Sequence, residues 1–138
     1  MRNPFSLCRL VVALVGTIAS VTPAMAQVRY RDIPNGALAV VAEVRAKTGK
    51  EQALREVTLP LVAQVRAEPN NLVYFLHEDR EAPGRFLFYE IFSALADFEA
   101  HNRTPHVQAW FARLPELAEG GVKVLRMEIL GNPTDSSR

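Results

Sequence analysis

The segment LVYFLHEDREAPGRFLFYEIF, residues 72–92, decides the fold that we expect for this chain. Its two ends, residues 72–78 and 85–92, are rich in aromatic and branched side chains, which favour β-strands. The stretch between them contains the pair Pro83-Gly84, which is typical of a tight connection. We therefore expect two strands that pair as a hairpin.

A helical pattern precedes this hairpin. In residues 50–68, apolar side chains recur at three- and four-residue steps, as on the buried face of a helix. The residues that carry this pattern are Leu54, Val57, Leu61 and Val65. Pro60 falls inside the pattern, where it removes a backbone donor and crowds the preceding turn. We expect a kink or a break in the helix at that point.

A second helical region follows the hairpin, and it also contains a break. Ser93 predicts the N-cap of the helix that comes directly after the third strand. Thr104 and Pro105 predict a restart, because Thr caps helices and proline lacks only a donor that the first turn does not use. The restarted helix is expected to run up to the glycine pair Gly120-Gly121.

Two further strands, residues 37–47 and 122–130, complete the domain. The resulting order β-α-β-β-α-β predicts an α+β, ferredoxin-like domain over residues 37–131. The last strand carries apolar side chains on both of its faces, so the outer face of the sheet needs a cover. A second copy of the chain is the simplest cover, and we expect a homodimer.

The two ends of the chain lie outside this domain. Residues 1–26 contain two arginines, an apolar or small run over residues 10–21 and a small-residue end at Ala26, which is the pattern of a cleaved signal peptide. An uncleaved anchor is the alternative, although the run is shorter than the about 20 residues that a membrane span needs. The sequence also predicts a short arm over residues 27–36 and a polar tail over residues 132–138.

Composition narrows the class of protein further. Cleavage near Ala26 would remove Cys8, the single cysteine, and leave neither a disulfide nor a thiolate nucleophile. A small exported domain without disulfides fits a periplasmic or secreted location. Without Arg2 and Arg9, 14 of the 16 Lys and Arg residues remain, against 15 Asp and Glu residues. Because the two signs of charge are nearly balanced and mixed along the chain, the composition argues against nucleic-acid binding. Glycine-rich phosphate or dinucleotide motifs and a nucleophile elbow are absent from the sequence.

Glu90 is the most unusual residue of the hairpin. The two-residue period of a strand places it on one face with Phe86, Phe88 and Phe92. Apolar surroundings disfavour the charged form of a carboxyl group, and this tunes the group for acid-base work near neutral pH. The alternative is a glutamate paired with an arginine across the sheet or the dimer interface.

His101 and His106 are the prominent polar residues of the second helical region. On one continuous helix, their five-residue separation places them roughly 140° apart, whereas a helical metal-binding pair prefers a four-residue step. The spacing therefore argues against a metal site. After the break, His106 shares a face with Trp110, and His101 shares one with Phe98. Such pairs are typical either of an aromatic core or of an apolar ligand pocket with a polar edge, to which Tyr74 could contribute.

Three stretches together resemble the antibiotic biosynthesis monooxygenase domain family: residues 37–56, residues 65–79 and residues 86–117. The most specific part is the string from Glu90 to His106. It begins with E-x-aromatic at the end of a strand and finishes with H-x-x-T-P-H. The resemblance covers about residues 37–131.

The resemblance implies a dimeric α/β barrel in which two sheets face each other. It also implies an enzyme that oxidises quinols, anthrones and related aromatic compounds with O2, without a bound metal or flavin. Glu90, His101 and His106 match polar positions of the family and become candidate catalytic residues, while Phe92 stands where the family usually has Trp. The candidate substrate-binding residues are Tyr74, Phe86, Phe88, Phe92 and Trp110.

In the expected reaction, Glu90 or His106 removes a phenolic proton, and the resulting anion transfers an electron to O2. The expected partners are a small aromatic substrate, O2 and a second copy of the chain, with no cofactor. Two other functions remain open. One is a non-catalytic barrel that binds a small aromatic compound, and the other is an isomerase that uses Glu90 and His106 as an acid-base pair.

Overall fold

A computed structural model of the protein describes residues 32–130. The signal peptide predicted for residues 1–26, the first part of the arm (residues 27–31) and the tail (residues 132–138) lie outside the described residues. The described part contains, in chain order, β1 (Leu38–Ala46), α1 (Glu51–Thr58), α2 (Leu61–Arg66), β2 (Asn71–Glu78), β3 (Arg85–Phe92), α3 (Leu95–His101), α4 (Pro105–Leu117) and β4 (Ala118–Glu128).

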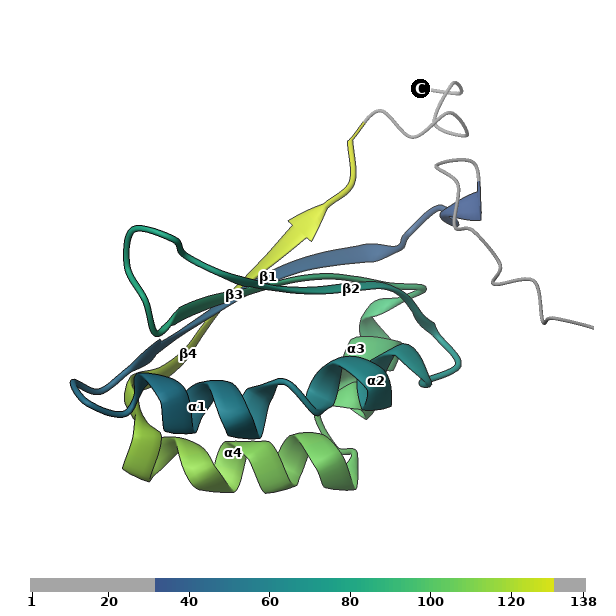
Figure 1. Cartoon of the computed structure of the whole chain (residues 1–138). Coiled ribbons are helices and arrows are strands. Elements are labelled where there is room, and N and C mark those ends of the chain that lie inside the picture. The colour runs from purple at the N-terminus through teal and green to yellow at the C-terminus, as the bar shows by residue number, and fades with distance from the viewer. Residues whose placement is uncertain (1–31, 131–138) are drawn as a thin grey trace, which may run out of the picture.

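The four strands form one antiparallel sheet in the order β2-β3-β1-β4. β2 and β3 pair as the expected hairpin, with Leu76 opposite Phe88. Figure 1 shows that all four helices lie on the same side of this sheet. The structure therefore confirms the predicted α+β, ferredoxin-like arrangement.

Both predicted helix breaks are confirmed. α1 ends at Thr58 and α2 begins at Leu61, with Pro60 in the N-cap position between them. α3 ends at His101 and α4 begins at Pro105, with Thr104 as its extended N-cap residue. The chain therefore turns twice where the sequence contains a proline near a helix end.

Two predicted boundaries are wrong. Ser93 is not an N-cap, because its backbone N–H still donates to the carbonyl of Asn70 at 3.1 Å and extends the strand pairing; Ala94 takes the cap position. β4 begins at Ala118 rather than at residue 122. Gly120-Gly121 is a bulge inside the strand, where positive φ angles of 66° and 74° are accommodated without a Cβ.

The main core lies between the sheet and the helices. Its largest fully buried members include Phe86 of β3, Leu54 of α1 and Leu117 of α4. One buried polar contact joins two helices in this core, because Trp110 Nε1 donates to Thr58 Oγ1 at 3.0 Å. The hydroxyl of Thr58 in turn donates to the carbonyl of Leu54 at 2.7 Å, so the buried polar atoms of this contact are paired.

The outer face of the sheet is only partly covered. Ile33 and Ala37, at the start of the described chain, pack with Ile91 over one end of this face. Elsewhere on it, large apolar side chains remain accessible, with Phe75 50% exposed and Leu125 62% exposed. Among residues 32–130, no helix is both long and apolar enough to span a membrane.

Candidate functional site

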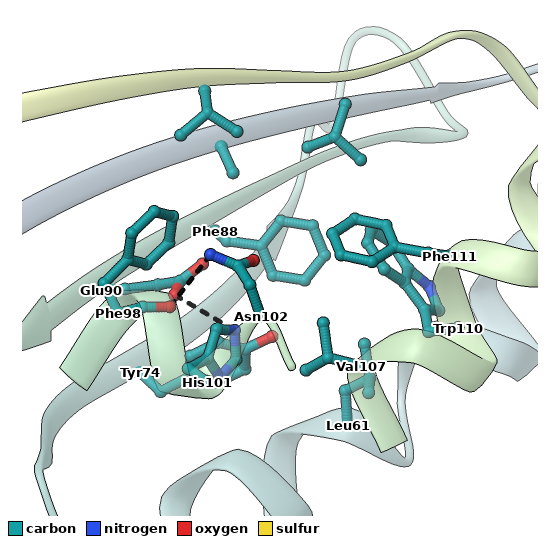
Figure 2. A pocket seen from close by; sticks show the side chains of 13 residues that line it. Leu61, Tyr74, Phe88, Glu90, Phe98, His101, Asn102, Val107, Trp110 and Phe111 are labelled. Atoms are coloured by element: carbon teal, nitrogen blue, oxygen red, sulfur yellow. Dashed lines mark hydrogen bonds and ion pairs between the residues drawn. The ribbon is translucent and has the colours of Figure 1, made fainter. Parts of the chain in front are cut away.

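A pocket lies between the sheet and the helices, and it encloses about 390 Å³ including its open mouth. Its walls are mainly aromatic and aliphatic, and Figure 2 shows the carboxyl group of Glu90 near the imidazole of His101 at one end. The lining residues come from β1, α2, β2, β3, α3, α4 and β4, with Asn102 from the turn after α3. They are Ala42, Leu61, Tyr74, Phe88, Glu90, Phe98, His101, Asn102, Val107, Trp110, Phe111, Val122 and Val124.

Glu90 reaches this pocket because β3 alternates between the two faces of the sheet. The same face carries Phe86, Phe88 and Phe92, and all four side chains are buried, as the alternation predicts. Glu90 is only 4% exposed, and its Oε2 atom has no hydrogen-bond partner. Burial, together with the negative charge of Glu68, raises the pKa of Glu90 to about 8. At neutral pH, Glu90 is therefore a carboxylic acid that can donate a hydrogen bond.

Within one copy of the chain, no arginine of residues 32–130 pairs with Glu90 across the sheet, whereas a pairing across a dimer interface stays a prediction. Among residues 32–130, the one ionisable partner within ion-pair distance is His101, whose Nε2 lies 3.9 Å from Glu90 Oε2 (Figure 2). This gap is too long for a direct hydrogen bond. A hydroxyl oxygen placed about 2.8 Å from each atom would bridge them.

His101 ends α3 and is held by aromatic rings. The ring centroid of Phe92 lies 5.0 Å from that of His101, and Phe98 stacks on it at 6.2 Å. Burial lowers the pKa of His101, although the hydrogen bond that its ring donates to Glu68 and the negative charge of Glu68 act in the opposite direction. His101 is therefore neutral at pH 7 and can accept a proton.

Glu68 belongs to the candidate site by its contacts, and the sequence did not predict it. It lies in the turn between α2 and β2, where Glu68-Pro69-Asn70-Asn71 reads only as a turn cluster. Both of its carboxylate oxygens lie 3.0 Å from His101 Nδ1, and Oε1 lies 2.7 Å from His106 Nε2. One carboxylate thus holds both histidines of the H-x-x-T-P-H string.

His106 lies away from the pocket lining. Its Nε2 faces Glu68 and the hydroxyl of Thr104, at 2.7 Å and 3.2 Å. Trp110, which was expected to share a face with it, does line the pocket, and its ring contacts Phe88 edge-on at 5.5 Å. The structure therefore brings Glu90 and His101 together in the pocket and places His106 behind them.

The spacing argument against a metal site was wrong in its premise. It assumed one continuous helix, whereas the chain leaves α3 after His101 and enters α4 at Pro105, so both histidines turn toward Glu68. The donor atoms of Glu68, His101 and His106 lie within 4.8 Å of one another, and these are ligand types that divalent metals accept.

The predicted aromatic residues divide into two groups. Tyr74, Phe88 and Trp110 line the pocket, whereas Phe86 and Phe92 support it from the core. Burial, followed by the nearby charges of Glu90 and Glu68, raises the pKa of Tyr74 far above its usual range. Tyr74 therefore keeps its phenolic proton and cannot serve as a base.

One protein-family model and two solved structures are similar to this chain. Residues 37–113 match the family model described as antibiotic biosynthesis monooxygenase. The crystal structure of PA3566 from Pseudomonas aeruginosa superposes with a TM-score of 0.67 at 30% identity, covering 70% of this chain and 97% of that one. A crystal structure described as an antibiotic biosynthesis monooxygenase is 26% identical, with a TM-score of 0.64, and covers 67% of this chain and 98% of that one.

A further similar protein has a name that gives no activity. The uncharacterized protein sll1783 of Synechocystis sp. is 25% identical over 97 residues, which are 70% of this chain. The matched part spans 64% of the length of that relative.

Proposed function

Because the chain belongs to the antibiotic biosynthesis monooxygenase family, we propose that it oxidises an electron-rich phenol, quinol or anthrone with O2 and without a metal or organic cofactor. The observation that carries this proposal is the pair formed by Glu90 and His101. These are the two titratable groups that meet at 3.9 Å at one end of an otherwise aromatic and aliphatic pocket. The apolar walls have the chemistry that suits an aromatic ring, and the gap between the pair suits a hydroxyl group on that ring.

The two residues take opposite roles in this proposal. His101 is the base, because it is neutral and its Nε2 faces the pocket. Glu90 is the acid that donates a hydrogen bond to the phenolate oxygen, because its pKa of about 8 keeps it protonated at neutral pH. The sequence-based mechanism with Glu90 or His106 as base is thereby replaced by one with His101 as base.

The reaction balances without a further reductant. Loss of the phenolic proton to His101 gives an anion that passes one electron to O2, and the resulting radical pair combines to form a C–O bond. The O–O bond then breaks. One oxygen atom stays in the product as a carbonyl. The other leaves as water with two hydrogens of the substrate, namely the hydroxyl proton that His101 took and now returns, and the hydrogen of the oxidised carbon. The protein contributes a dry pocket, a base and an acid.

The same pair also suits proton transfer alone, which keeps the isomerase as a second candidate. An isomerase would use His101 in place of His106, because His101 is the histidine that lines the pocket. O2 consumption separates the two functions, since an isomerase consumes none. Tight binding without any turnover would instead favour the non-catalytic barrel.

The experiment follows O2 uptake and product mass with a panel of hydroquinones and anthrones. We expect His101→Asn to lower kcat by about 10²-fold or more, because the base is removed. Glu90→Gln keeps a hydrogen-bond donor and should retain part of the activity, while it loses the decline that wild type shows as pH rises through about 8. Glu116→Gln, with a side chain that is 65% exposed, is the control. Wild-type rates equal to those of His101→Asn would contradict the proposal.

Export and dimerisation belong to the same proposal. The signal-peptide pattern of residues 1–26 supports a periplasmic or secreted location. An N-terminus near Gln27 in material from the periplasm or medium would support cleavage, and Met1 there would contradict it. The partly exposed outer face of the sheet supports a homodimer in which a second copy covers that face.

A further inference from the structure

Glu68 lies outside the pocket and contacts one of its lining residues, His101. It borders a second cavity of about 360 Å³ that is open to solvent, and Asn70, Asp97 and Thr104 are among the other side chains that line this cavity. His101 borders both the second cavity and the pocket that holds Glu90. The imidazole ring is therefore the wall between the two spaces, with Nδ1 on the Glu68 side and Nε2 on the Glu90 side.

The hydrogen-bond network determines which nitrogens carry protons, starting from Thr104. The hydroxyl of Thr104 donates to the carbonyl of His101 at 2.7 Å, so its oxygen is left as an acceptor toward His106 Nε2 at 3.2 Å. Glu68 Oε1, 2.7 Å from the same nitrogen, is also an acceptor. The proton between them must therefore come from His106, which carries it on Nε2.

The same reasoning applies to His101. A carboxylate has no proton to give, so the contacts of 3.0 Å from both oxygens of Glu68 to Nδ1 require a proton on that nitrogen. In a neutral imidazole with Nδ1 protonated, Nε2 carries the lone pair. The lone pair then faces Glu90 and the pocket.

We propose that Glu68 is a positioning residue that fixes His101 in the tautomer with its proton on Nδ1, so that the Nε2 lone pair faces the substrate hydroxyl. The role in catalysis rests on the proposed function, whereas the tautomer itself does not. When His101 takes the substrate proton, the Glu68 carboxylate also stabilises the imidazolium that forms. His106 and Thr104 hold Glu68 Oε1 in place for this task.

A glutamine at position 68 should reverse the tautomer. Because His106 must donate from Nε2, the amide oxygen of Gln would remain on His106 and the amide nitrogen would turn to His101. The amide nitrogen is a donor, so His101 Nδ1 would become an acceptor and its proton would move to Nε2. His101 would then face the substrate with an N–H and could not act as its base.

The test is ¹⁵N NMR of the purified protein labelled at histidine, with Glu68→Gln as the variant and Glu116→Gln as the exposed control. The chain has three histidines, and loss of one signal set in His101→Asn assigns those of His101. We expect Nδ1 to be protonated in wild type and in Glu116→Gln, and Nε2 to be protonated in Glu68→Gln. We also expect kcat of Glu68→Gln to fall by about 10²-fold or more at little-changed KM, because Glu68 does not line the pocket.

Three results on the tautomer and the activity would overturn the proposal. They are a proton on Nε2 of His101 in wild type, an unchanged tautomer in a folded Glu68→Gln variant, and full activity of that variant.

A metal-binding role for Glu68, His101 and His106 would also overturn the proposal. It would appear as a shift of the His101 and His106 signals with one equivalent of Zn²⁺, and this shift would be abolished in Glu68→Gln. If the variant fails to fold, Glu68→Asp should keep the wild-type tautomer, and loss of it would refute the role. Inactivity of wild type toward every quinol would refute the proposed function while the tautomer result still tests Glu68.

Discussion

Replacing Glu90 with glutamine is expected to stabilise the protein as pH rises. Burial raises the pKa of Glu90 from 4.5 to about 8 in the folded chain, whereas the unfolded chain ionises near the ordinary value. For a carboxyl group with a raised pKa in the fold, the stabilising contribution is full below the unfolded pKa and is lost as pH rises toward the folded pKa. The slope of this loss is about 1.4 kcal/mol per pH unit.

Between pH 5 and pH 7.5, wild type should lose about 3 kcal/mol of unfolding free energy relative to Glu90→Gln. Urea unfolding followed by circular dichroism at pH 5, 6 and 7.5 measures the difference between the two proteins. Protonated Glu and Gln are nearly the same size, so packing effects cancel when the difference at pH 5 is subtracted. Glu116→Gln, at a side chain that is 65% exposed, is the control for the substitution itself. A difference between wild type and Glu90→Gln that stays constant with pH would refute the reasoning, because Glu90 would then be ionised in the folded protein.

Three further outcomes follow from the fold. Thr58→Val removes the acceptor of the buried Trp110 Nε1–H, and should lower the free energy of unfolding by about 1–3 kcal/mol in urea titrations; an unchanged midpoint would contradict the importance of this contact. Gly84→Ala should lower the free energy of unfolding by about 1–2 kcal/mol more than Gly49→Ala does. Both glycines have a positive φ, but only the new Cβ at position 84 would meet Glu51 Cγ, at 2.6 Å. Equal thermal midpoints of the two variants would argue against this clash. In sedimentation experiments, wild type should be a dimer at micromolar concentration and Leu125→Glu a monomer with unchanged circular dichroism, whereas a monomeric wild type would contradict the covered outer face.

The strands and the order of the elements could be predicted because their signals are local. Alternating side chains specify a strand, and Pro60 and Pro105 fall where helices end or begin, so short windows of sequence contain the information. Ser93 was misassigned for the opposite reason. A nearby strand end competes for its backbone, since Asn70 accepts its N–H, and no local pattern reports that contact.

The site was predictable only in part. Glu90 could be recognised because the carboxyl group and its three phenylalanine neighbours belong to one strand. The role of Glu68 could not, because it depends on a turn that is 33 residues away from His101 in the sequence. The convergence of the two histidines depends on the angle between two short helices, which a helical projection of one continuous helix cannot represent.

Trp110 gives this protein a built-in optical probe. It is the single tryptophan of the chain, it is 7% exposed, and its ring lines the same pocket as Glu90 and His101. Intrinsic emission excited at the red edge of protein absorption therefore comes from one indole in one pocket. A ligand that enters should change the intensity or wavelength of that emission without any label. Libraries of unrelated aromatic compounds can thus be screened for occupancy before any reaction product has been identified.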